Sequence, residues 1–246
     1  MSTPLAIVGC GRMGRLVEDL APEYGFAVSA RFTRGNIASL SRNSLNGATV
    51  AIEFTAARAA LENLPKLAAL GVDTVCGSTG WYQALPQVRQ VIQDAGTALV
   101  FGANFAVGVN LFLEIVGKAA ALFAQHPEYE AWGWEIHHSQ KKDAPSGTLK
   151  KLAEVMRAAG LSGNLPLSSS RAGAHVGTHE IGFDCAADTI TLRHTAKSRE
   201  GFARGALQAA QWISGKKGVF EFREILGELR LPATATRQGA EWARTQ

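Results

Sequence analysis

The chain has 246 residues, of which 46% are hydrophobic and 19% are charged, and its formal net charge at pH 7 is +4. This length allows one large domain or two smaller ones with proper cores, and this composition excludes an intrinsically disordered protein. The Lys and Arg residues are scattered and form no patch interleaved with aromatic side chains. Nucleic acid is therefore a poor candidate partner, and small anionic ligands are a better one.

The cysteines and the apolar segments indicate the compartment. Cys10, Cys76 and Cys185 have no metal-binding spacing, and an odd number fits no disulfide framework, so we interpret them as reduced packing residues. The most apolar stretch, 97–117, is broken by glycines, asparagines and a glutamate, and is not expected to span a membrane. No signal peptide is expected before the apolar run that begins at Leu5, and we therefore expect a cytoplasmic protein.

The first hundred residues alternate short apolar runs with amphipathic stretches. An apolar run at 5–8 precedes a stretch with Leu16, Val17 and Leu20 at helical spacing. The other expected strands are 26–31, 49–54, 72–76 and 98–101, and the expected helices between the later strands are 56–70 and 86–95. Strands that alternate with helices in this rhythm predict an α/β fold with a doubly wound parallel sheet of the Rossmann type.

A glycine motif follows the first apolar run and opens the first helix. It reads Gly9-x-Gly11-x-x-Gly14, with Arg12 and Met13 before the last glycine. Glycines in this context permit a tight turn and let a pyrophosphate approach the helix amides. A turn without a ligand has the same pattern, but the alternation of strands and helices around it favours a nucleotide site.

The segment after the second expected strand lacks an acidic residue. Rossmann proteins that select NAD usually carry Asp or Glu there, about 20 residues beyond the glycines. Here residues 30–34 read Ala-Arg-Phe-Thr-Arg. Thr33 and Arg34 are predicted to bind the 2′-phosphate of NADPH, which should serve at least as well as NADH. The alternative is that the arginines are solvated charges at a strand end.

Small polar residues end two further strands of the expected parallel sheet. Gly77-Ser78-Thr79-Gly80 follows the fourth strand, and Gly102-Ala103-Asn104-Phe105 follows the fifth. Either segment alone is typical of an ordinary turn. Open α/β sheets bind ligands at the carboxyl ends of their strands, so these segments together with the glycine motif favour a cofactor crevice.

The pattern changes after about residue 105, which indicates a second domain. The expected helices are 107–123, 146–159 and 202–213, and the expected strands are 130–138, 167–171, 175–183 and 189–195. A hairpin loop at 184–188 should join the last two strands. We expect a dinucleotide domain, then a domain with a mixed sheet, and then a C-terminal segment that returns to the first domain.

The strand at 130–138 alternates between two kinds of side chain. One face carries Trp132, Trp134 and Ile136, and the other carries Glu135 and His137. Such alternation predicts a sheet with one buried face and one face that carries functional side chains. The tryptophans are expected in a core or an interface rather than as a platform for stacking.

The segment 135–148 is the most informative part of the chain. It reads Glu-Ile-His-His-Ser-Gln-Lys-Lys-Asp-Ala-Pro-Ser-Gly-Thr. Its imidazole and ammonium groups supply charge and protons, and the helix that opens after Pro145 offers free amides to a carboxylate. Each residue alone has an ordinary structural interpretation. Together they indicate a site that holds an anion and delivers a proton.

The other histidines carry less information. His175, His179 and His194 lie on expected strands and are interpreted as structural or peripheral, and His126 lies in a loop. The histidines have no metal-site spacing and no cysteine or carboxylate completes one, so no metal is expected.

With these motifs located, the chain resembles the 4-hydroxy-tetrahydrodipicolinate reductase (dihydrodipicolinate reductase) family over most of its length. The matching motifs are Gly-x-Gly-Arg-Met-Gly at 9–14, Glu-Phe-Thr at 53–55, Gly-Ser-Thr-Gly at 77–80, Ala-Asn-Phe-Ala-Val-Gly-Val-Asn at 103–110, His-His-x-x-Lys-x-Asp-Ala-Pro-Ser-Gly-Thr at 137–148, Arg-Ala-Gly at 171–173, Val-Gly-Thr-His-Glu at 176–180, His-x-Ala-x-Ser-Arg at 194–199 and Gly-Phe-Ala-x-Gly at 201–205. The block at 137–148 is highly specific to this family, whereas the glycine motif is not.

The resemblance implies an enzyme of the diaminopimelate and lysine pathway. It implies that NADPH or NADH reduces 4-hydroxy-tetrahydrodipicolinate, a small cyclic dicarboxylate, to tetrahydrodipicolinate. It also implies a dinucleotide-binding domain at 1–106, a smaller α+β domain for substrate binding and oligomerisation at 107–200, and a segment at 201–246 that returns to the first domain. The open sheet of the second domain would build a homotetramer.

The resemblance also implies roles for individual residues. His137 and Lys141 take the proton-donor places. The substrate-carboxylate places fall on His138, Gly147 and Thr148. The cofactor places fall on the glycine motif and on the two strand ends, with Gly77, Ser78, Thr79, Gly102, Ala103, Asn104 and Phe105 on the nicotinamide side.

Two other functions remain open at this point. Another two-domain Rossmann oxidoreductase, such as an amino-acid or semialdehyde dehydrogenase, would need a catalytic constellation outside 135–148, and the sequence offers none. A non-catalytic NAD(P)-binding or sensing module would be favoured if His137 or Lys141 were absent, and both are present.

Overall fold

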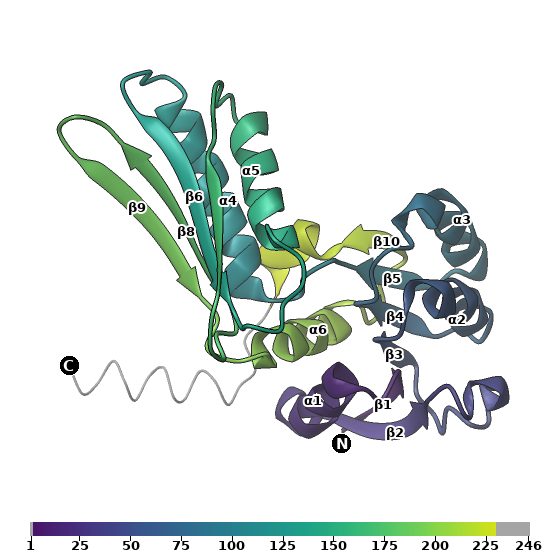
Figure 1. The fold of residues 1–246 in the computed structure, drawn as a ribbon. Helices are drawn as coiled ribbons and strands as arrows, with labels where there is room; N and C mark the ends of the chain where they lie inside the picture. Colours follow the sequence, from purple (N-terminus) through teal and green to yellow (C-terminus); the bar gives the residue numbers. More distant parts are fainter. Residues whose placement is uncertain (1, 230–246) are drawn as a thin grey trace, which may run out of the picture. The chain divides into compact units, whose positions relative to one another are not determined.

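The structure, a computed structural model, describes residues 2–229 (Figure 1). The chain divides into two compact units. The first unit comprises Met1–Ala106 and Phe202–Gln246, and the second comprises Val107–Gly201. The last part of the expected 201–246 segment, residues 230–246, lies outside the described residues.

The first unit contains a six-stranded parallel sheet in the order β10-β5-β4-β3-β1-β2. Its strands are β1 (Thr3–Val8), β2 (Phe26–Phe32), β3 (Val50–Glu53), β4 (Asp73–Cys76), β5 (Ala98–Phe101) and β10 (Gly218–Glu221). Its helices are α1 (Arg12–Leu20), α2 (Ala57–Ala69), α3 (Leu85–Ala95) and α6 (Glu200–Trp212), with the short 3-10 segments η1 (Ala21–Tyr24), η2 (Ile37–Ser39), η3 (Tyr82–Ala84) and η4 (Phe222–Glu228). The expected doubly wound sheet of the Rossmann type is confirmed.

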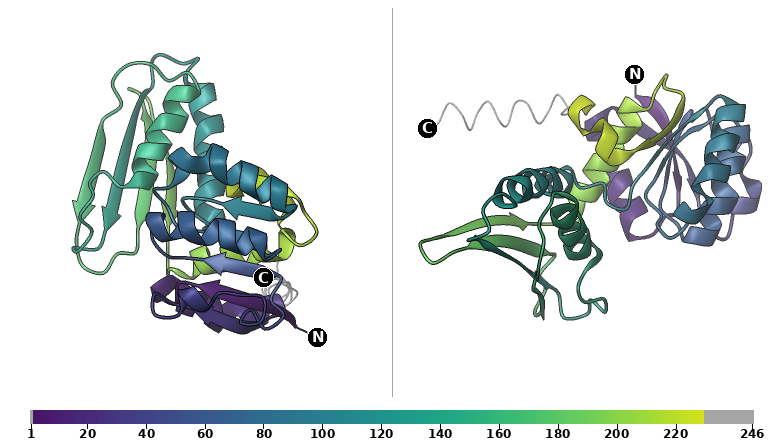
Figure 2. Two further views of the ribbon diagram at one scale, coloured as in Figure 1. Left: turned by 90° about the vertical axis from the view of Figure 1, so that its right-hand side faces the viewer. Right: turned by 90° about the horizontal axis from the view of Figure 1, so that it is seen from above.

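The central strands of this sheet are continuous apolar runs, as in sheets that are covered on both faces. Leu5, Ile7, Ile52 and Leu99 have no exposed surface. Helices α2 and α3 cover one face, and α1 and α6 cover the other (Figure 2). Because the strands are parallel, the segments that follow β1 to β5 meet at one edge of the sheet.

Strand β10 was not predicted from the sequence. Its four residues pair in register with β5, from Gly218 beside Ala98 to Glu221 beside Phe101. The pairing adds a strand from the C-terminal part of the chain, so β5 is an inner strand of the finished sheet.

The second unit contains a four-stranded mixed sheet in the order β7-β6-β8-β9. Its strands are β6 (Glu130–His137), β7 (Leu167–Arg171), β8 (Thr178–Asp184) and β9 (Thr189–Thr195), and its helices are α4 (Val107–Phe123) and α5 (Gly147–Ala158). Strands β6 and β7 are parallel, and β8 is antiparallel to both β6 and β9. The expected open mixed sheet and its hairpin are confirmed. Across residues 2–229, no helix combines the length and the hydropathy that a bilayer span requires.

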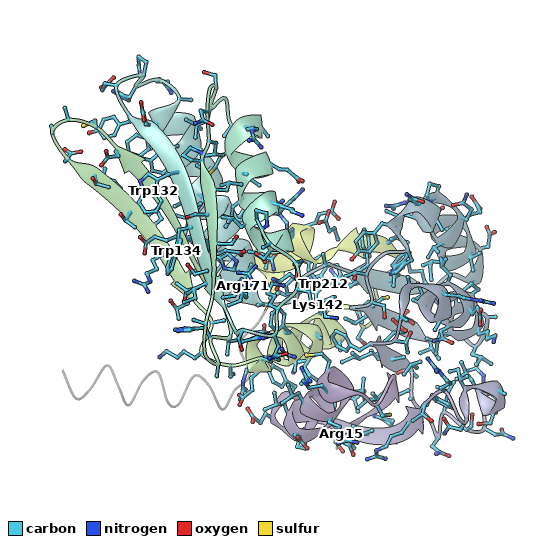
Figure 3. All side chains as sticks on the ribbon, viewed as in Figure 1. Arg15, Trp132, Trp134, Lys142, Arg171 and Trp212 are labelled. Atoms are coloured by element: carbon cyan, nitrogen blue, oxygen red, sulfur yellow. The ribbon has the colours of Figure 1, made fainter. Side chains whose placement is uncertain are left out.

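The alternation along β6 is confirmed, but its tryptophans, which were expected in a core or an interface, do not lie in a core. Trp132 and Trp134 are only half-buried and lie on the face that α4 and α5 leave uncovered (Figure 3). The buried residues of β6 are Ala131, Gly133, Glu135 and His137. A Cβ at Gly133 would lie 3.1 Å from the Leu149 side chain, so the small residues of this face let α5 pack closely. Placement of the tryptophans in an interface stays a prediction.

Candidate active site

The glycine motif lies where the first unit's sheet changes its direction of growth, because β2 and β3 flank β1 on opposite sides. Gly9 has a φ of 99°, and a Cβ there would lie 2.2 Å from the Phe54 carbonyl oxygen. A Cβ on Gly14 would lie 2.2 Å from the Gly9 carbonyl oxygen, so this glycine lets α1 approach β1. Around Gly11 a Cβ would meet nothing within 4 Å, and no side chain caps α1. The free amides at the start of α1 therefore fit a pyrophosphate.

The segment after β2 is exposed and is held in a turn by Asn36. The Asn36 side-chain oxygen accepts hydrogen bonds from the Thr33 backbone N at 2.6 Å and from Thr33 Oγ1 at 3.1 Å. Arg31 is paired with Glu18 of α1. Arg34 is exposed and has no ion-pair partner in the described part of the chain. Arg34, rather than Arg31, is the guanidinium left for a phosphate.

The strand end after β4 is fixed by hydrogen bonds of its own. The Ser78 hydroxyl accepts a hydrogen bond from the Thr55 backbone N at 2.7 Å, and the Ser78 carbonyl accepts one from the Trp81 indole at 2.8 Å. A Cβ on Gly77 would overlap a phenylalanine ring at 2.0 Å. Thr79 is exposed. The hydroxyl oxygen and the carbonyl oxygen of Ser78 both accept hydrogen bonds that hold this strand end in place.

The strand end after β5 is anchored by an aromatic contact. Phe105 is 2% exposed and packs on Phe222 with ring centroids 4.6 Å apart. Gly102 is buried, and a Cβ there would lie 3.0 Å from Phe222 Cβ, whereas Ala103 is exposed. The Asn104 side-chain oxygen accepts a hydrogen bond from a backbone amide two residues on, at 2.8 Å. Ala103 is therefore the accessible small residue of this strand end. At the start of α1, Arg12 is exposed and Met13 is half-buried.

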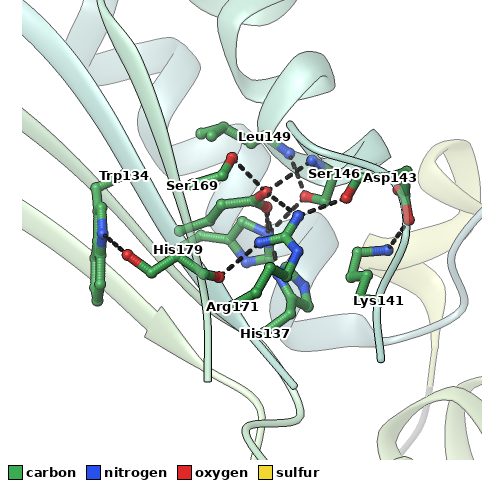
Figure 4. A network of polar contacts seen from close by, with 11 residues as sticks. Trp134, His137, Lys141, Asp143, Ser146, Leu149, Ser169, Arg171 and His179 are labelled. Carbon is green, nitrogen blue, oxygen red and sulfur yellow. Dashed lines mark hydrogen bonds and ion pairs between the residues drawn. The ribbon is translucent and has the colours of Figure 1, made fainter. Parts of the chain in front are cut away.

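A fully buried carboxylate organises the candidate site of the second unit (Figure 4). Glu135 Oε1 accepts hydrogen bonds from the Ser146 backbone N at 2.8 Å, from Ser169 Oγ at 2.8 Å and from Arg171 Nη2 at 2.9 Å. Burial opposes ionisation of Glu135. The hydrogen bonds from Ser146, Arg171 and Ser169 outweigh it and lower the pKa of Glu135 to about 2.

Two imidazoles face this carboxylate. Glu135 Oε2 lies 3.4 Å from His137 Nδ1 and 3.4 Å from His179 Nε2. Burial lowers the pKa of His137, and it lowers the pKa of His179 to about 4, with His137 adding to the latter shift. Both rings are therefore neutral at pH 7.

Lys141 is more accessible than Arg171, the other cation of this site. Its side chain is 24% exposed, and its Nζ lies 2.7 Å from Asp143 Oδ1. The hydrogen bond from Lys141 lowers the pKa of Asp143. Lys142 is exposed, whereas His138 is half-buried and begins the turn that Lys141 closes through its backbone N.

The start of α5 is capped by Ser146. Ser146 Oγ accepts a hydrogen bond from the Leu149 backbone N at 3.2 Å and also lies 3.2 Å from His179 Nε2. Helix geometry leaves the amides of Gly147 and Thr148 without a partner inside the helix. A Cβ on Gly147 would meet nothing within 4 Å. These two amides are therefore available to donate hydrogen bonds to an anion.

The fold brings together three groups that the sequence spacing did not suggest as metal ligands. One atom each of Glu135, His137 and His179 can be chosen so that all three lie within 4.8 Å of one another. Glu135 Oε1 already accepts three hydrogen bonds, one of them from the Arg171 guanidinium. A cation next to Arg171 is electrostatically disfavoured, and we assign the cluster no metal.

His137, Lys141 and the start of α5 lie in one polar network, as their spacing suggested (Figure 4). Sequence reasoning missed the parts contributed by β7 and β8. His179 was interpreted as structural or peripheral, but it is 4% exposed and contacts both Glu135 and Ser146. The signal was present, because Arg171 and His179 each belong to a family motif.

Comparisons with known proteins point to one family over most of the chain. A family model described as "Dihydrodipicolinate reductase, N-terminus" matches residues 3–105, and one described as "Dihydrodipicolinate reductase, C-terminus" matches residues 108–226. A relative from Christiangramia forsetii named 4-hydroxy-tetrahydrodipicolinate reductase is 31% identical over 238 residues, which cover 92% of this chain and 98% of the relative. A relative of the same name from Methanosarcina barkeri is 33% identical over 267 residues, which cover 91% of this chain and 98% of the relative.

Solved structures share the fold. Dipicolinate-bound dihydrodipicolinate reductase from Paenisporosarcina sp. TG-14 has a TM-score of 0.78 at 22% identity, with 92% of this chain and 100% of that one covered. Amine dehydrogenase from Mycobacterium smegmatis has a TM-score of 0.62 at 11% identity, with 94% and 97% covered. At these identities the likeness concerns the fold alone.

Proposed function

The chain belongs to the dihydrodipicolinate reductase family, and on that premise we propose how its residues carry out the reaction. The reaction is the NAD(P)H-dependent reduction of 4-hydroxy-tetrahydrodipicolinate to tetrahydrodipicolinate, in diaminopimelate and lysine biosynthesis. The observation that carries the residue roles is the network joining His137 and Lys141 to the open amides of α5.

The first unit is the proposed dinucleotide-binding domain. A bound reduced nicotinamide supplies the hydride. The amides at the start of α1 would hold its pyrophosphate beside Gly11, where there is space for it. The proposed nicotinamide-side residues are Gly77, Ser78, Thr79, Gly102, Ala103, Asn104 and Phe105.

The second unit is the proposed substrate domain. Hydride addition to an unsaturated ring leaves negative charge that a proton must neutralise, and Lys141, as an ammonium paired with Asp143, carries one. His137 is neutral at pH 7 and is proposed to assist beside it. His138 and the amides of Gly147 and Thr148 are proposed to bind the substrate carboxylates. A dicarboxylate bound to the Paenisporosarcina enzyme supports this chemistry.

A coupled assay tests the function directly. Dihydrodipicolinate synthase would supply the substrate, and the absorbance of NADPH or NADH would report its consumption. The absence of enzyme-dependent consumption with both cofactors at saturating substrate would contradict catalysis and favour a non-catalytic NAD(P)-binding module.

Thr148→Val should raise KM more than it lowers kcat. The change removes the hydroxyl at nearly constant shape, at a half-buried position next to the open helix amides. A net contribution of about 1.5–3 kcal/mol for a hydrogen bond to a charged group corresponds to roughly a 10- to 150-fold change in KM. Steady-state kinetics with varied substrate checks this, and an unchanged KM would count against the role of Thr148.

Arg34→Ala should reduce the efficiency with NADPH and spare that with NADH. Arg34 has no ion-pair partner among residues 2–229 and suits the 2′-phosphate, which NADH lacks. Its loss should lower kcat/KM for NADPH about tenfold, by analogy with charge-assisted hydrogen bonds. Arg42→Ala, at another exposed arginine of the first unit, is the control. Undiminished NADPH efficiency in Arg34→Ala, or a clear wild-type preference for NADH, would contradict this assignment.

We further propose a homotetramer in the cytoplasm, where reduced nicotinamide is maintained. The support for association is the uncovered sheet face with the half-buried Trp132 and Trp134. Light scattering of the purified protein gives its mass, and a monomer at micromolar concentration would contradict the proposal.

A further inference from the structure

The buried carboxylate of Glu135 makes contacts that the proposed roles above do not use. Its Oε1 binds the start of α5 through Ser146 and binds β7 through Ser169 and Arg171. Arg171 Nη2 also donates a hydrogen bond to the Asp143 carbonyl, beside Lys141. Oε1 thus fixes the anion-binding helix to the strands that carry the rest of the site.

The other oxygen, Oε2, has unused capacity. It lies 3.4 Å from His137 Nδ1, and neither atom makes a hydrogen bond within the described residues. A buried polar atom without a partner is destabilising, and a hydrogen on Nδ1 that points at Oε2 satisfies both atoms. His179 Nε2 is equally close to Oε2 but already has Ser146 Oγ at 3.2 Å. His137 is therefore the ring that depends on this oxygen.

The far side of the His137 ring is kept free by a glycine. A Cβ on Gly177 would lie 2.8 Å from His137 Nε2. Any other residue at position 177 would crowd that nitrogen. The arrangement has a carboxylate against one ring nitrogen and a glycine against the other.

We propose that Glu135 is a positioning residue that holds His137 as the tautomer protonated on Nδ1 and leaves the Nε2 lone pair available to the reaction. Carboxylates orient imidazoles in this way in hydrolase triads. The kinetic part of this proposal rests on the proposed function, because Glu135 acts on the reaction only through His137.

The charges around His137 predict how the site titrates. The titratable and charged groups that face the ring are Glu135 on β6, Arg171 on β7, His179 on β8, and Lys141 and Asp143 in the loop after β6. Burial lowers the pKa of His137, and the charge of Glu135 opposes that effect. Without this charge, two cations face one carboxylate, so the pKa of His137 falls further. Any limb of the pH profile that reports His137 then moves to lower pH.

Glu135→Gln tests the proposal. The amide keeps an oxygen for the three donors but places an NH2 group where Oε2 was, and this group cannot accept from Nδ1. In protein labelled with 15N-histidine, NMR should show His137 protonated on Nδ1 in the wild type and on Nε2 in the variant. The variant's kcat/KM should fall at least about tenfold, towards the roughly 10⁴-fold loss seen when a triad carboxylate becomes an amide. Its pH limb should move to lower pH.

Two control variants separate positioning from general effects. Glu154→Gln removes an exposed carboxylate of α5, paired with Lys151, and should change neither the tautomer nor the kinetics. Ser169→Ala removes one donor to Oε1 but leaves Oε2, so the tautomer and the pH limb should stay as in the wild type.

The proposal is overturned by a wild-type His137 protonated on Nε2, a result that does not depend on whether the variant folds. It is also overturned if folded Glu135→Gln keeps the wild-type tautomer and pH profile. The tautomer is measured without substrate. A wild type that lacks reductase activity therefore contradicts the proposed function and leaves the assignment of Glu135 to His137 standing.

Discussion

Lys141→Ala should lower kcat by about 10²–10⁴-fold while the protein stays folded, because loss of a general acid typically costs that much. Lys141 is the more accessible of the site's two cations, Lys141 and Arg171, and its Nζ lies 2.7 Å from Asp143 Oδ1. Its methylene chain is not part of a core, so truncation should leave stability nearly unchanged. Single-turnover measurements with saturating cofactor would isolate the chemical step from product release.

Lys142→Ala is the matched control, since Lys142 is the next residue and is exposed. It should retain kcat within about twofold, as surface substitutions usually have small effects. His137→Ala should also lower kcat by about 10²–10⁴-fold with folding intact. If Lys142→Ala is as damaging as Lys141→Ala, the proton donor has been placed wrongly.

Arg171→Ala should destabilise the second unit by about 3–5 kcal/mol at pH 7, because it leaves a buried carboxylate without its cation. Glu135 is 0% exposed, and Arg171 Nη2 donates to it at 2.9 Å. Arg193→Ala is the control. Arg193 pairs with Glu180 at 3.6 Å with its side chain 59% exposed, so its loss should cost no more than about 1 kcal/mol. Urea unfolding at one protein concentration measures both.

The pH dependence of the Arg171→Ala effect has a definite sign. In the wild type the pKa of Glu135 is lowered to about 2, so its stabilising contribution is present above the unfolded pKa of about 4.3 and is lost as the pH falls towards 2. Without Arg171, burial raises the pKa of Glu135. Glu135 of the folded variant is therefore protonated at a higher pH than in the wild type. The difference in the free energy of unfolding between wild type and variant should therefore be largest at pH 7 and should become smaller towards pH 4. A gap of the same size at both pH values would show that the guanidinium acts through packing alone.

The alternation of elements predicted the fold well because the inner strands are simple apolar runs. The run at 98–101 is an example, since Leu99 and Val100 have no exposed surface and the segment could only be a covered strand. Strand β10 was missed because its four residues carry no period of their own. These residues form a strand because they can pair with the backbone groups of β5, which lies more than 100 residues earlier in the chain.

The faces of β6 were the harder inference. Hydrophobicity alone places Trp132 and Trp134 inside, but the helices pack over Gly133 and Ala131, where small residues leave room. Glu135 is buried because donors from α5 and β7 satisfy it. Those donors lie 11 to 36 residues away along the chain, so no local pattern could reveal them. The clustering of His137, Lys141 and the start of α5 was predictable because these residues share one short segment.

The pairing of β10 with β5 has a consequence for the order in which the chain is made. After Phe101 the ribosome must add 120 residues to complete β10 at Glu221, and these include the whole second unit. At about 5–20 residues per second this takes roughly 6–24 s. During that interval one side of β5 has no strand to pair with, and an unpaired apolar edge invites association with other nascent chains. Chaperones that shield this edge during translation should therefore matter more for the yield of native protein than the stability of the finished sheet suggests.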